Sequence, residues 1–237
     1  AGDLPKGLEA VSRLGYDGVE LSLLDSAAVD RGQLKARLGD LGLKAFAIAT
    51  GQTWVMEGCS LFNEDPARRQ KAIDRLRGHI DLAAELGSMV IVGGIRGVVP
   101  AEGHPARAAS LDAGQEAVRA CVQHAQGSGV GLLLEPINRY ETNVVNTLAE
   151  GLEMIRALGS PRLKLLPDTF HMNIEEPSIP GSLKAAGQAV GYVHFADSNR
   201  LAPGWGHLDF EGVVAALADI GYGGAIGIEV LPKPDSL

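Results

Sequence analysis

The sequence predicts an α/β protein of the (β/α)8 TIM-barrel class, forming one domain over residues 1–237. Short apolar runs alternate with amphipathic segments along the chain, as in a protein built from repeated helix–strand units. Most changes from helix to strand are marked by a Leu-Gly or Ile-Gly pair, and glycine after a helix adopts the left-handed cap that other residues resist. The runs are apolar throughout, which is typical of parallel strands buried on both faces.

Seven apolar runs are predicted to be strands, and five of them follow a Leu/Ile-Gly pair. The strands are expected near residues 18–23, 44–50, 89–93, 131–136, 163–168, 191–196 and 224–230. The helix-ending glycines are Gly15, Gly42, Gly87, Gly159 and Gly221. Alternating helices and strands over this length predict either a (β/α)8 barrel or a doubly wound sheet.

Three of the intervening helices can be recognised from their caps or apolar faces. The first begins at Asp65-Pro66, an N-cap followed by a first-turn proline. Asp209 caps another helix. The apolar faces consist of Ile73, Leu76, Ile80 and Ala83; of Leu148, Leu152 and Ile155; and of Phe210, Val213, Leu217 and Ile220. These positions are assigned to the core and carry no predicted function.

The number of strands is one short of a closed barrel. We therefore expect the first strand and the last helix of the barrel to be missing from this chain, before Ala1 and after Leu237. An open, doubly wound sheet is the alternative that the same alternation allows. The barrel is favoured because the polar residues described below need a ring of strands to converge.

Composition narrows the classes of function. The net charge of −8 disfavours a nucleic-acid partner, since phosphate binding needs a basic surface. No apolar run approaches the ~18 residues that a membrane span requires. Cys59 and Cys121 lie far apart without metal-site spacing, so two free thiols are expected rather than a disulfide. We expect a cytoplasmic protein that contacts neither nucleic acid nor membrane.

Four ionisable residues stand where four consecutive predicted strands end: Glu135, Asp168, His194 and Glu229. In a βα barrel these strand ends open into one pocket. Taken singly, each residue has a structural alternative, such as a turn cap, a core histidine or a solvated charge. A buried carboxylate without a partner is costly, so four such groups in register point to one divalent-metal site. Mostly oxygen ligands and one imidazole favour Mn²⁺, with Mg²⁺ or Co²⁺ as alternatives, over a structural zinc.

Three segments and one strand end carry a resemblance to a known family. They are residues 135–141, 168–176 and 194–200, and the strand ending in Glu229. With this spacing the chain resembles, from about Gly15 to Leu231, the D-tagatose/D-psicose (ketose) 3-epimerases of the xylose-isomerase-like barrel superfamily. Residues 138–143 look most like a branch that handles keto-sugars or keto-acids of the 5-ketogluconate type.

The resemblance implies roles for seven residues. Glu135, Asp168, His194 and Glu229 would bind one divalent metal ion, and Glu135 and Glu229 would also serve as the catalytic acid/base pair. Glu141, His171 and Arg200 match substrate-holding positions. Without the family pattern, these three would be a loop charge, a helix-start residue and a surface residue. Glu175 and Glu176 are expected to be solvated charges before Pro177.

The implied reaction is C3 epimerisation of a ketose or related keto-sugar acid through a cis-enediolate. Inversion needs one group to remove a proton from one face and another to return a proton to the opposite face, which explains two glutamates. The metal would polarise the carbonyl, while Arg200 and His171 would donate hydrogen bonds to the developing oxyanion. The expected partners are a small sugar and further copies of the chain, as a homodimer or homotetramer.

Several alternatives share this fold or site. An aldose–ketose isomerase related to hydroxypyruvate isomerase needs only one base, and an inosose dehydratase could use the same metal. An abasic-site endonuclease is disfavoured by the acidic charge and by the lack of histidine or acidic ligands at residues 47–50 and 92–95. A sugar-binding barrel without catalysis would have no reason to keep two bases beside an arginine.

Overall fold

The Leu/Ile-Gly pairs end helices as predicted. In the computed structural model, which describes residues 4–231, the five glycines have left-handed backbones. Their φ values are +80° for Gly15, +66° for Gly42, +70° for Gly87, +64° for Gly159 and +68° for Gly221. A side chain at such a position would strain the backbone, so glycine is the residue that lets each helix stop and turn into the next strand.

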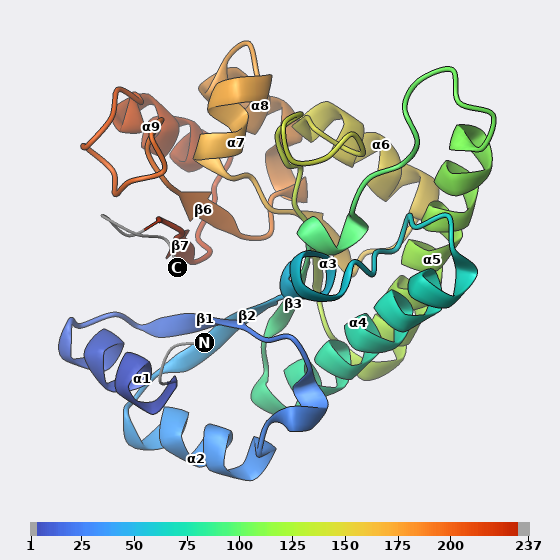
Figure 1. Ribbon diagram of the computed structural model, residues 1–237. Helices are drawn as coiled ribbons and strands as arrows, with labels where there is room; N and C mark the ends of the chain where they lie inside the picture. Colours follow the sequence, from blue (N-terminus) through green and yellow to red (C-terminus); the bar gives the residue numbers. More distant parts are fainter. Residues whose placement is uncertain (1–3, 232–237) are drawn as a thin grey trace. The chain divides into compact units, whose positions relative to one another are not determined.

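The chain divides after Leu132 into two compact units. In order, the first contains α1 (Leu4–Arg13), β1 (Gly18–Ser22), the 3₁₀ turn η1 (Ser26–Ala28), α2 (Arg31–Asp40), β2 (Lys44–Ala49), α3 (Gln52–Glu57), α4 (Pro66–Leu86), β3 (Met89–Val92), η2 (Gly94–Arg96) and α5 (Arg107–Ser128). Strands β1, β2 and β3 pair in this order and run parallel (Figure 1). The three predicted N-terminal strands are confirmed almost to the residue.

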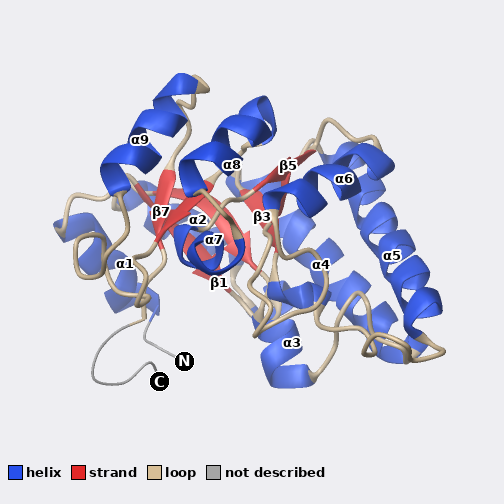
Figure 2. Ribbon diagram, turned by 90° about the horizontal axis from the view of Figure 1, so that it is seen from above, coloured by secondary structure: helices blue, strands red, loops and turns tan. Residues whose placement is uncertain are grey.

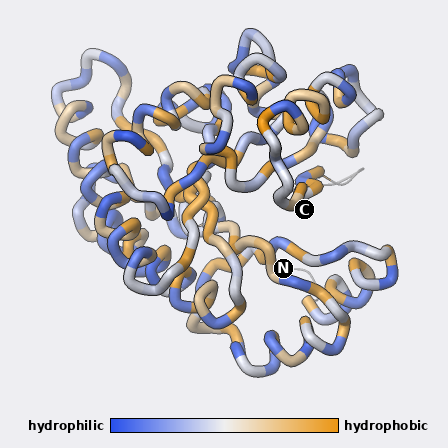
Figure 3. Tube along the Cα trace, turned by 180° about the vertical axis from the view of Figure 1, so that it is seen from behind, coloured by the Kyte–Doolittle hydropathy of each residue, from blue (hydrophilic) through white to orange (hydrophobic). Residues whose placement is uncertain are grey.

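The core of the first unit forms where the helices cover these strands. Ile48 and Val90 are fully buried in the sheet, and Leu76 and Ile80 of α4 are fully buried as well. Hydrophobic and hydrophilic residues alternate along the long helices α4 and α5, which pack side by side (Figure 3). As predicted, the Asp65 side chain caps α4 by accepting a hydrogen bond from the Ala67 N–H at 2.8 Å.

The second unit continues the alternation with shorter strands. It begins within β4 (Leu132–Leu134) and contains α6 (Leu148–Leu158), β5 (Leu163–Leu165), α7 (Thr169–Glu175), α8 (Ile179–Ala186), the 3₁₀ turn η3 (Gly187–Ala189), β6 (Val193–Phe195), α9 (Phe210–Asp219) and β7 (Ile226–Ile228). Each of these four strands is three residues long, shorter than predicted. Pro136 and Pro167 contribute to this, because proline cannot donate the hydrogen bond that would continue a strand ladder.

Helices α6, α8 and α9 pack on the strands of this unit through one apolar cluster. Its members include Leu148, Leu165, Leu183, Val193, Phe195, Val213 and Leu217. Helices α8 and α9 lie next to each other outside β6 and β7 (Figure 2). Asp209 caps α9 as predicted, with its carboxylate 2.9 Å from the Gly212 N–H that donates to it.

Cys59 and Cys121 are both free and buried, which confirms the prediction of two thiols. Within residues 4–231, no helix is long and apolar enough to cross a membrane.

Candidate metal centre

Strand register in the second unit brings the four predicted ligands together. The Leu166 N–H donates to the Leu134 carbonyl at 2.8 Å, which sets the strand-end residue Glu135 beside the end of β5. Asp168 pairs with His194 in an isolated parallel bridge. In turn, β6 and β7 pair so that His194 lies opposite Gly227, two residues before Glu229. The convergence therefore follows from backbone pairing along the ends of β4 to β7.

The side chains of these four residues point at one another. One candidate ligand atom from each of Glu135, Asp168, His194 and Glu229 lies within 4.8 Å of the others. His194 Nδ1 is 3.7 Å from a Glu135 oxygen, 3.7 Å from Asp168 Oδ2 and 3.2 Å from Glu229 Oε2. Ligands around one ion with bonds of about 2.1 Å are separated by similar distances.

The site concentrates negative charge. Glu135 and Asp168 are buried, whereas 41% of the Glu229 side chain is exposed although its carboxylate lies against His194. Burial and the charges of Glu135 and Asp168 raise the pKa of Glu229 to about 7, against the lowering effect of its hydrogen bond with His194. Burial alone would raise the pKa of Asp168, but His194 and Arg200 hold it well below its usual range.

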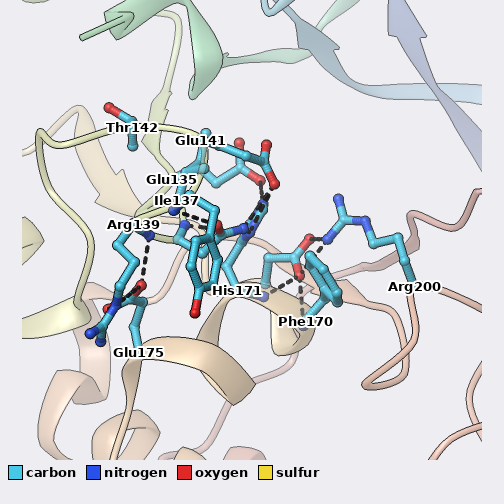
Figure 4. Close-up of polar contacts among 12 residues, drawn as sticks. Glu135, Ile137, Arg139, Glu141, Thr142, Phe170, His171, Glu175 and Arg200 are labelled. Atoms are coloured by element: carbon cyan, nitrogen blue, oxygen red, sulfur yellow. Dashed lines mark hydrogen bonds and ion pairs between the residues drawn. The ribbon is translucent and has the colours of Figure 1, made fainter.

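Arg200 supplies the main positive charge at the cluster. Its Nη1 donates to both Asp168 oxygens at 3.0 and 2.9 Å, and its Nη2 donates to Glu229 Oε2. The guanidinium also lies over the Phe170 ring, 4.8 Å from the centroid (Figure 4). Arg200, considered alone, would have been placed on the surface, but its side chain is only 14% exposed.

The donor set fits a divalent cation. Three carboxylates face one arginine, so two negative charges remain when all three are ionised. Carboxylate oxygens with a single imidazole are ligands suited to Mn²⁺ or Mg²⁺ rather than to a thiolate-bound structural zinc. Among residues 4–231, this is also the one group of three or more His, Cys, Asp or Glu side chains arranged to hold a metal ion.

The predicted substrate-holding residues His171 and Glu141 lie beside this cluster and are linked by Asn138. The Asn138 amide Nδ2 is 2.8 Å from His171 Nδ1 and donates to Glu141 Oε1 at 2.8 Å, while its Oδ1 accepts from the Tyr140 N–H at 3.0 Å. The other ring nitrogen of His171 lies 4.0 Å from a Glu135 oxygen (Figure 4). Asn138 was not among the predicted site residues, although it lies inside the segment 135–141.

The expectation that Glu175 and Glu176 are solvated charges is wrong. The Glu175 side chain is 4% exposed and accepts from the Arg139 backbone N–H at 2.6 Å and from its Nη2 at 2.7 Å (Figure 4). Glu176 accepts from the Leu148 N–H at 2.7 Å and from the Ser182 hydroxyl at 2.6 Å. Glu175 thus connects α7 with the loop after β4, and Glu176 connects the first residue of α6 with α8. Both residues therefore stabilise the packing of these elements.

Gly227 leaves the space that His194 needs. A Cβ at this position would lie 2.7 Å from the Tyr192 hydroxyl and 3.0 Å from His194 Cδ2, both too close. We expect Gly227→Ala to displace the imidazole and to weaken binding of a divalent metal ion about tenfold, as changes next to metal ligands do. Titration calorimetry with Mn²⁺ measures this, with Gly223→Ala as the control, because a Cβ there meets nothing within 4 Å. Equal affinities in the two variants would contradict the expectation.

Parallel strands that alternate with helices and present a carboxylate-rich cluster at their ends define a barrel-type α/β protein with a candidate metal site. The chain belongs to the xylose isomerase-like TIM barrel family, whose family model matches residues 8–236. This confirms the predicted fold class.

Proteins similar to this chain in sequence include sugar epimerases. The chain is 34% identical to the L-ribulose 3-epimerase of Methylomonas sp. (strain DH-1), over 94% of this chain and 77% of that protein. It is also 34% identical to the ketose 3-epimerase of Arthrobacter globiformis, over 91% and 73% of the two chains. The crystal structure of a D-allulose 3-epimerase from Methylomonas sp. in complex with D-allulose superposes with a TM-score of 0.85, at 32% identity, covering 98% of this chain and 79% of the other. These relatives confirm the resemblance to ketose 3-epimerases.

Proposed function

We propose that this protein is a divalent-metal-dependent epimerase that inverts C3 of a ketose or a related keto-sugar acid. The observation that carries the proposal is the convergence of Glu135 and Glu229 on His194, within one four-residue group, in a chain 34% identical to two 3-epimerases. Two carboxylates that both reach one small site are what inversion of a carbon requires.

The residues of the site have three roles: proton transfer, stabilisation of developing negative charge, and metal binding. One of Glu135 and Glu229 takes the proton from C3, and the other returns a proton to the opposite face, so that no net oxidation or loss of atoms occurs. Arg200 and His171 donate hydrogen bonds to the oxygens on which negative charge develops. Glu135, Asp168, His194 and Glu229 would hold the metal ion, for which we propose Mn²⁺. When bound, it would polarise the substrate carbonyl.

Glu141 and Asn138 complete the substrate-holding side of the site. Glu141 is 57% exposed in its side chain, and its Oε1 accepts from Asn138. An exposed carboxylate held in this way can accept hydrogen bonds from sugar hydroxyls. Asn138 is 1% exposed and donates to Glu141 while it contacts His171, so it fixes both side chains.

Asn138→Asp is expected to lower kcat/KM by about 10- to 100-fold, because a carboxylate cannot donate to either neighbour and leaves a buried polar contact unmade. The new charge would also repel Glu141. Adding Glu141→Gln removes this repulsion but leaves His171 without the side-chain donor, although the backbone N–H of residue 138 still lies 3.5 Å from His171 Nδ1. Steady-state kinetics of the single and double variants therefore separate the two effects. Activity of the double variant above that of Glu141→Gln alone would contradict the role given to Asn138.

The proposed function is tested by isotope exchange. The Mn²⁺-loaded protein is incubated in D2O with a panel of ketoses and keto-acids, and the products are read by proton NMR after chelation of the metal. Deuterium at C3 together with the C3 epimer is the expected result. The panel also includes 3-keto-glycosides, because the chain is 28% identical to the 3-dehydro-D-guloside 4-epimerase of Escherichia coli.

Other outcomes identify the alternatives. Deuterium at C1 with formation of an aldose would indicate an isomerase, and loss of water from the substrate a dehydratase. Binding of a sugar without exchange at any carbon would indicate a binding protein. In each of these cases the proposal of C3 epimerisation is wrong, and the isomerase outcome also contradicts the assignment of Glu135 and Glu229 to opposite faces.

We further propose that the protein works in the cytoplasm as a homodimer or homotetramer. The support is general, since most soluble oligomers are closed assemblies of one chain. Light scattering at several protein concentrations measures the mass in solution. A mass equal to that of one chain at all concentrations would contradict the proposed assembly.

A further inference from the structure

The backbone at Arg200 is strained. Its φ is +61°, in the left-handed region that residues with a side chain rarely occupy. Within residues 4–231, the other non-glycine residue with a positive φ is Val145. Because Arg200 bridges Asp168 and Glu229, the direction of its side chain depends on this unusual backbone. Strain of this kind persists only where surrounding contacts enforce it.

Asp197 provides those contacts. Its carbonyl accepts from the Arg200 N–H at 2.9 Å, and its own N–H donates to the Leu201 carbonyl at 2.8 Å, so the turn that contains Arg200 closes on Asp197. Its carboxylate accepts hydrogen bonds from the backbone N–H groups of Ser198 at 2.7 Å, Gly204 at 2.8 Å and Leu208 at 3.1 Å. These bonds hold the rest of the loop around the Asp197 side chain.

The Asp197 carboxylate is enclosed by this loop. It is 1% exposed, and a Cβ on Gly206 would lie 2.1 Å from its Oδ1, so only glycine fits there. Burial alone would raise the pKa of Asp197, but hydrogen bonds from four backbone N–H groups lower it to about 2. The carboxylate therefore binds main-chain N–H groups of the loop, and these hydrogen bonds hold the loop in place.

The loop is anchored to α7, the helix that Asp168 caps. The Thr169 hydroxyl donates to the Ala196 carbonyl at 2.7 Å and accepts from the Ala196 N–H at 3.0 Å. Thr169 is fully buried and follows Asp168, which Arg200 contacts at 2.9 Å. The turn of Arg200 and the carboxylate that it binds are therefore held by one connected set of hydrogen bonds.

We propose that Asp197 is a positioning residue that acts through Arg200: it folds residues 197–208 into the loop that aims the guanidinium at Asp168, Glu229 and the substrate. The inference rests on the proposed function and deepens it. It assigns to a residue outside the metal cluster and outside the predicted substrate-holding set a defined contribution to the reaction. Releasing the loop would let Arg200 leave its left-handed backbone and turn its side chain away.

A double-mutant cycle tests the proposal. Asp197→Asn keeps the size of the side chain, but its NH2 group would face backbone donors and cannot accept from them. We expect kcat/KM for C3 exchange to fall about 100-fold, as small misplacements of a catalytic group do. Arg200→Ala is expected to lose at least as much, and the double variant no more than Arg200→Ala alone. Losses that multiply in the double variant would overturn the proposal.

A control variant distinguishes positioning from a general loss of stability. Asp209→Ala removes a carboxylate that also accepts a backbone N–H, at the start of α9, so it lowers the melting temperature by loss of a helix cap. Its effect on kcat/KM should be small and should multiply with that of Arg200→Ala. If Asp209→Ala reproduced the non-additive loss of Asp197→Asn, the effect would be one of stability, and the proposal would fall.

A readout without substrate separates this inference from the proposed function. Amide hydrogen exchange of the Mg²⁺-loaded protein is compared between wild type and Asp197→Asn. Ser198, Arg200, Gly204 and Leu208 should exchange faster in the variant, while β6 and β7 keep their protection. Unchanged exchange at Arg200 would overturn the inference. If the wild type catalysed no C3 exchange, the proposed function would fail, and amide exchange alone would decide the role of Asp197.

Discussion

Replacing Glu135 or Glu229 by glutamine is expected to lower the rate of epimerisation about 10³-fold, within the range that a positioned acid or base contributes. An amide keeps the size and part of the ligand capacity of the carboxylate but cannot take a proton. The measurement is the rate of C3 inversion at saturating Mn²⁺, so that weaker metal binding does not account for the loss. Glu153→Gln, on the exposed face of α6, is the matched control.

The two variants should fail in different ways. With one base left, each variant can still remove the C3 proton from one epimer and return a deuteron to the same face. Deuterium then enters C3 without inversion, and the two variants select opposite epimers. Complete loss of exchange from both epimers in one variant, with normal activity in the other, would indicate a single base and would favour the isomerase alternative.

The order of elements and the four clustered residues could be predicted from the sequence because both depend on local patterns. A glycine after an apolar helix position marks a helix end wherever it occurs, as at Gly87 and Gly159. Glu135, Asp168 and Glu229 follow apolar runs and His194 lies within one, and parallel strands present their carboxyl ends on one side. Strand lengths were predicted less well: β4 to β7 have three residues each, fewer than the apolar runs that predicted them.

The residues that hold the site in place could not be predicted in the same way. Glu175 has the composition of a surface charge, and its partner Arg139 lies 36 positions away in the chain. A hydropathy pattern does not predict the partners of Asn138 and Asp197. Asn138 contacts a histidine 33 positions away, and Asp197 accepts hydrogen bonds from backbone N–H groups of a loop. Asn138, Glu175 and Asp197 share one feature that the sequence does show. Each is a polar residue inside a segment that resembles the 3-epimerases, as Asp197 is between His194 and Arg200.

Removing the metal should abolish turnover while leaving the protein folded. Arg200 continues to neutralise part of the charge of Asp168 and Glu229 after chelation, and the apolar cluster of the second unit does not involve the metal ligands. We therefore expect a dialysed, EDTA-treated sample to lose all activity and regain it with Mn²⁺. Its free energy of unfolding should rise by about 2.7 kcal/mol when free Mn²⁺ reaches 100 times the dissociation constant. Melting curves at several Mn²⁺ concentrations measure this.

Arg200→Ala separates metal binding from catalysis in the same experiment. Removing a positive charge next to the ligands lowers the repulsion felt by a divalent cation, so Mn²⁺ should bind at least as tightly as in the wild type. The kcat/KM should nevertheless fall at least 100-fold, because no guanidinium remains to stabilise the developing negative charge. A variant that binds Mn²⁺ much more weakly than wild type would show that Arg200 chiefly orders Asp168 and Glu229. Arg200 would then have a structural role and would not stabilise the developing negative charge.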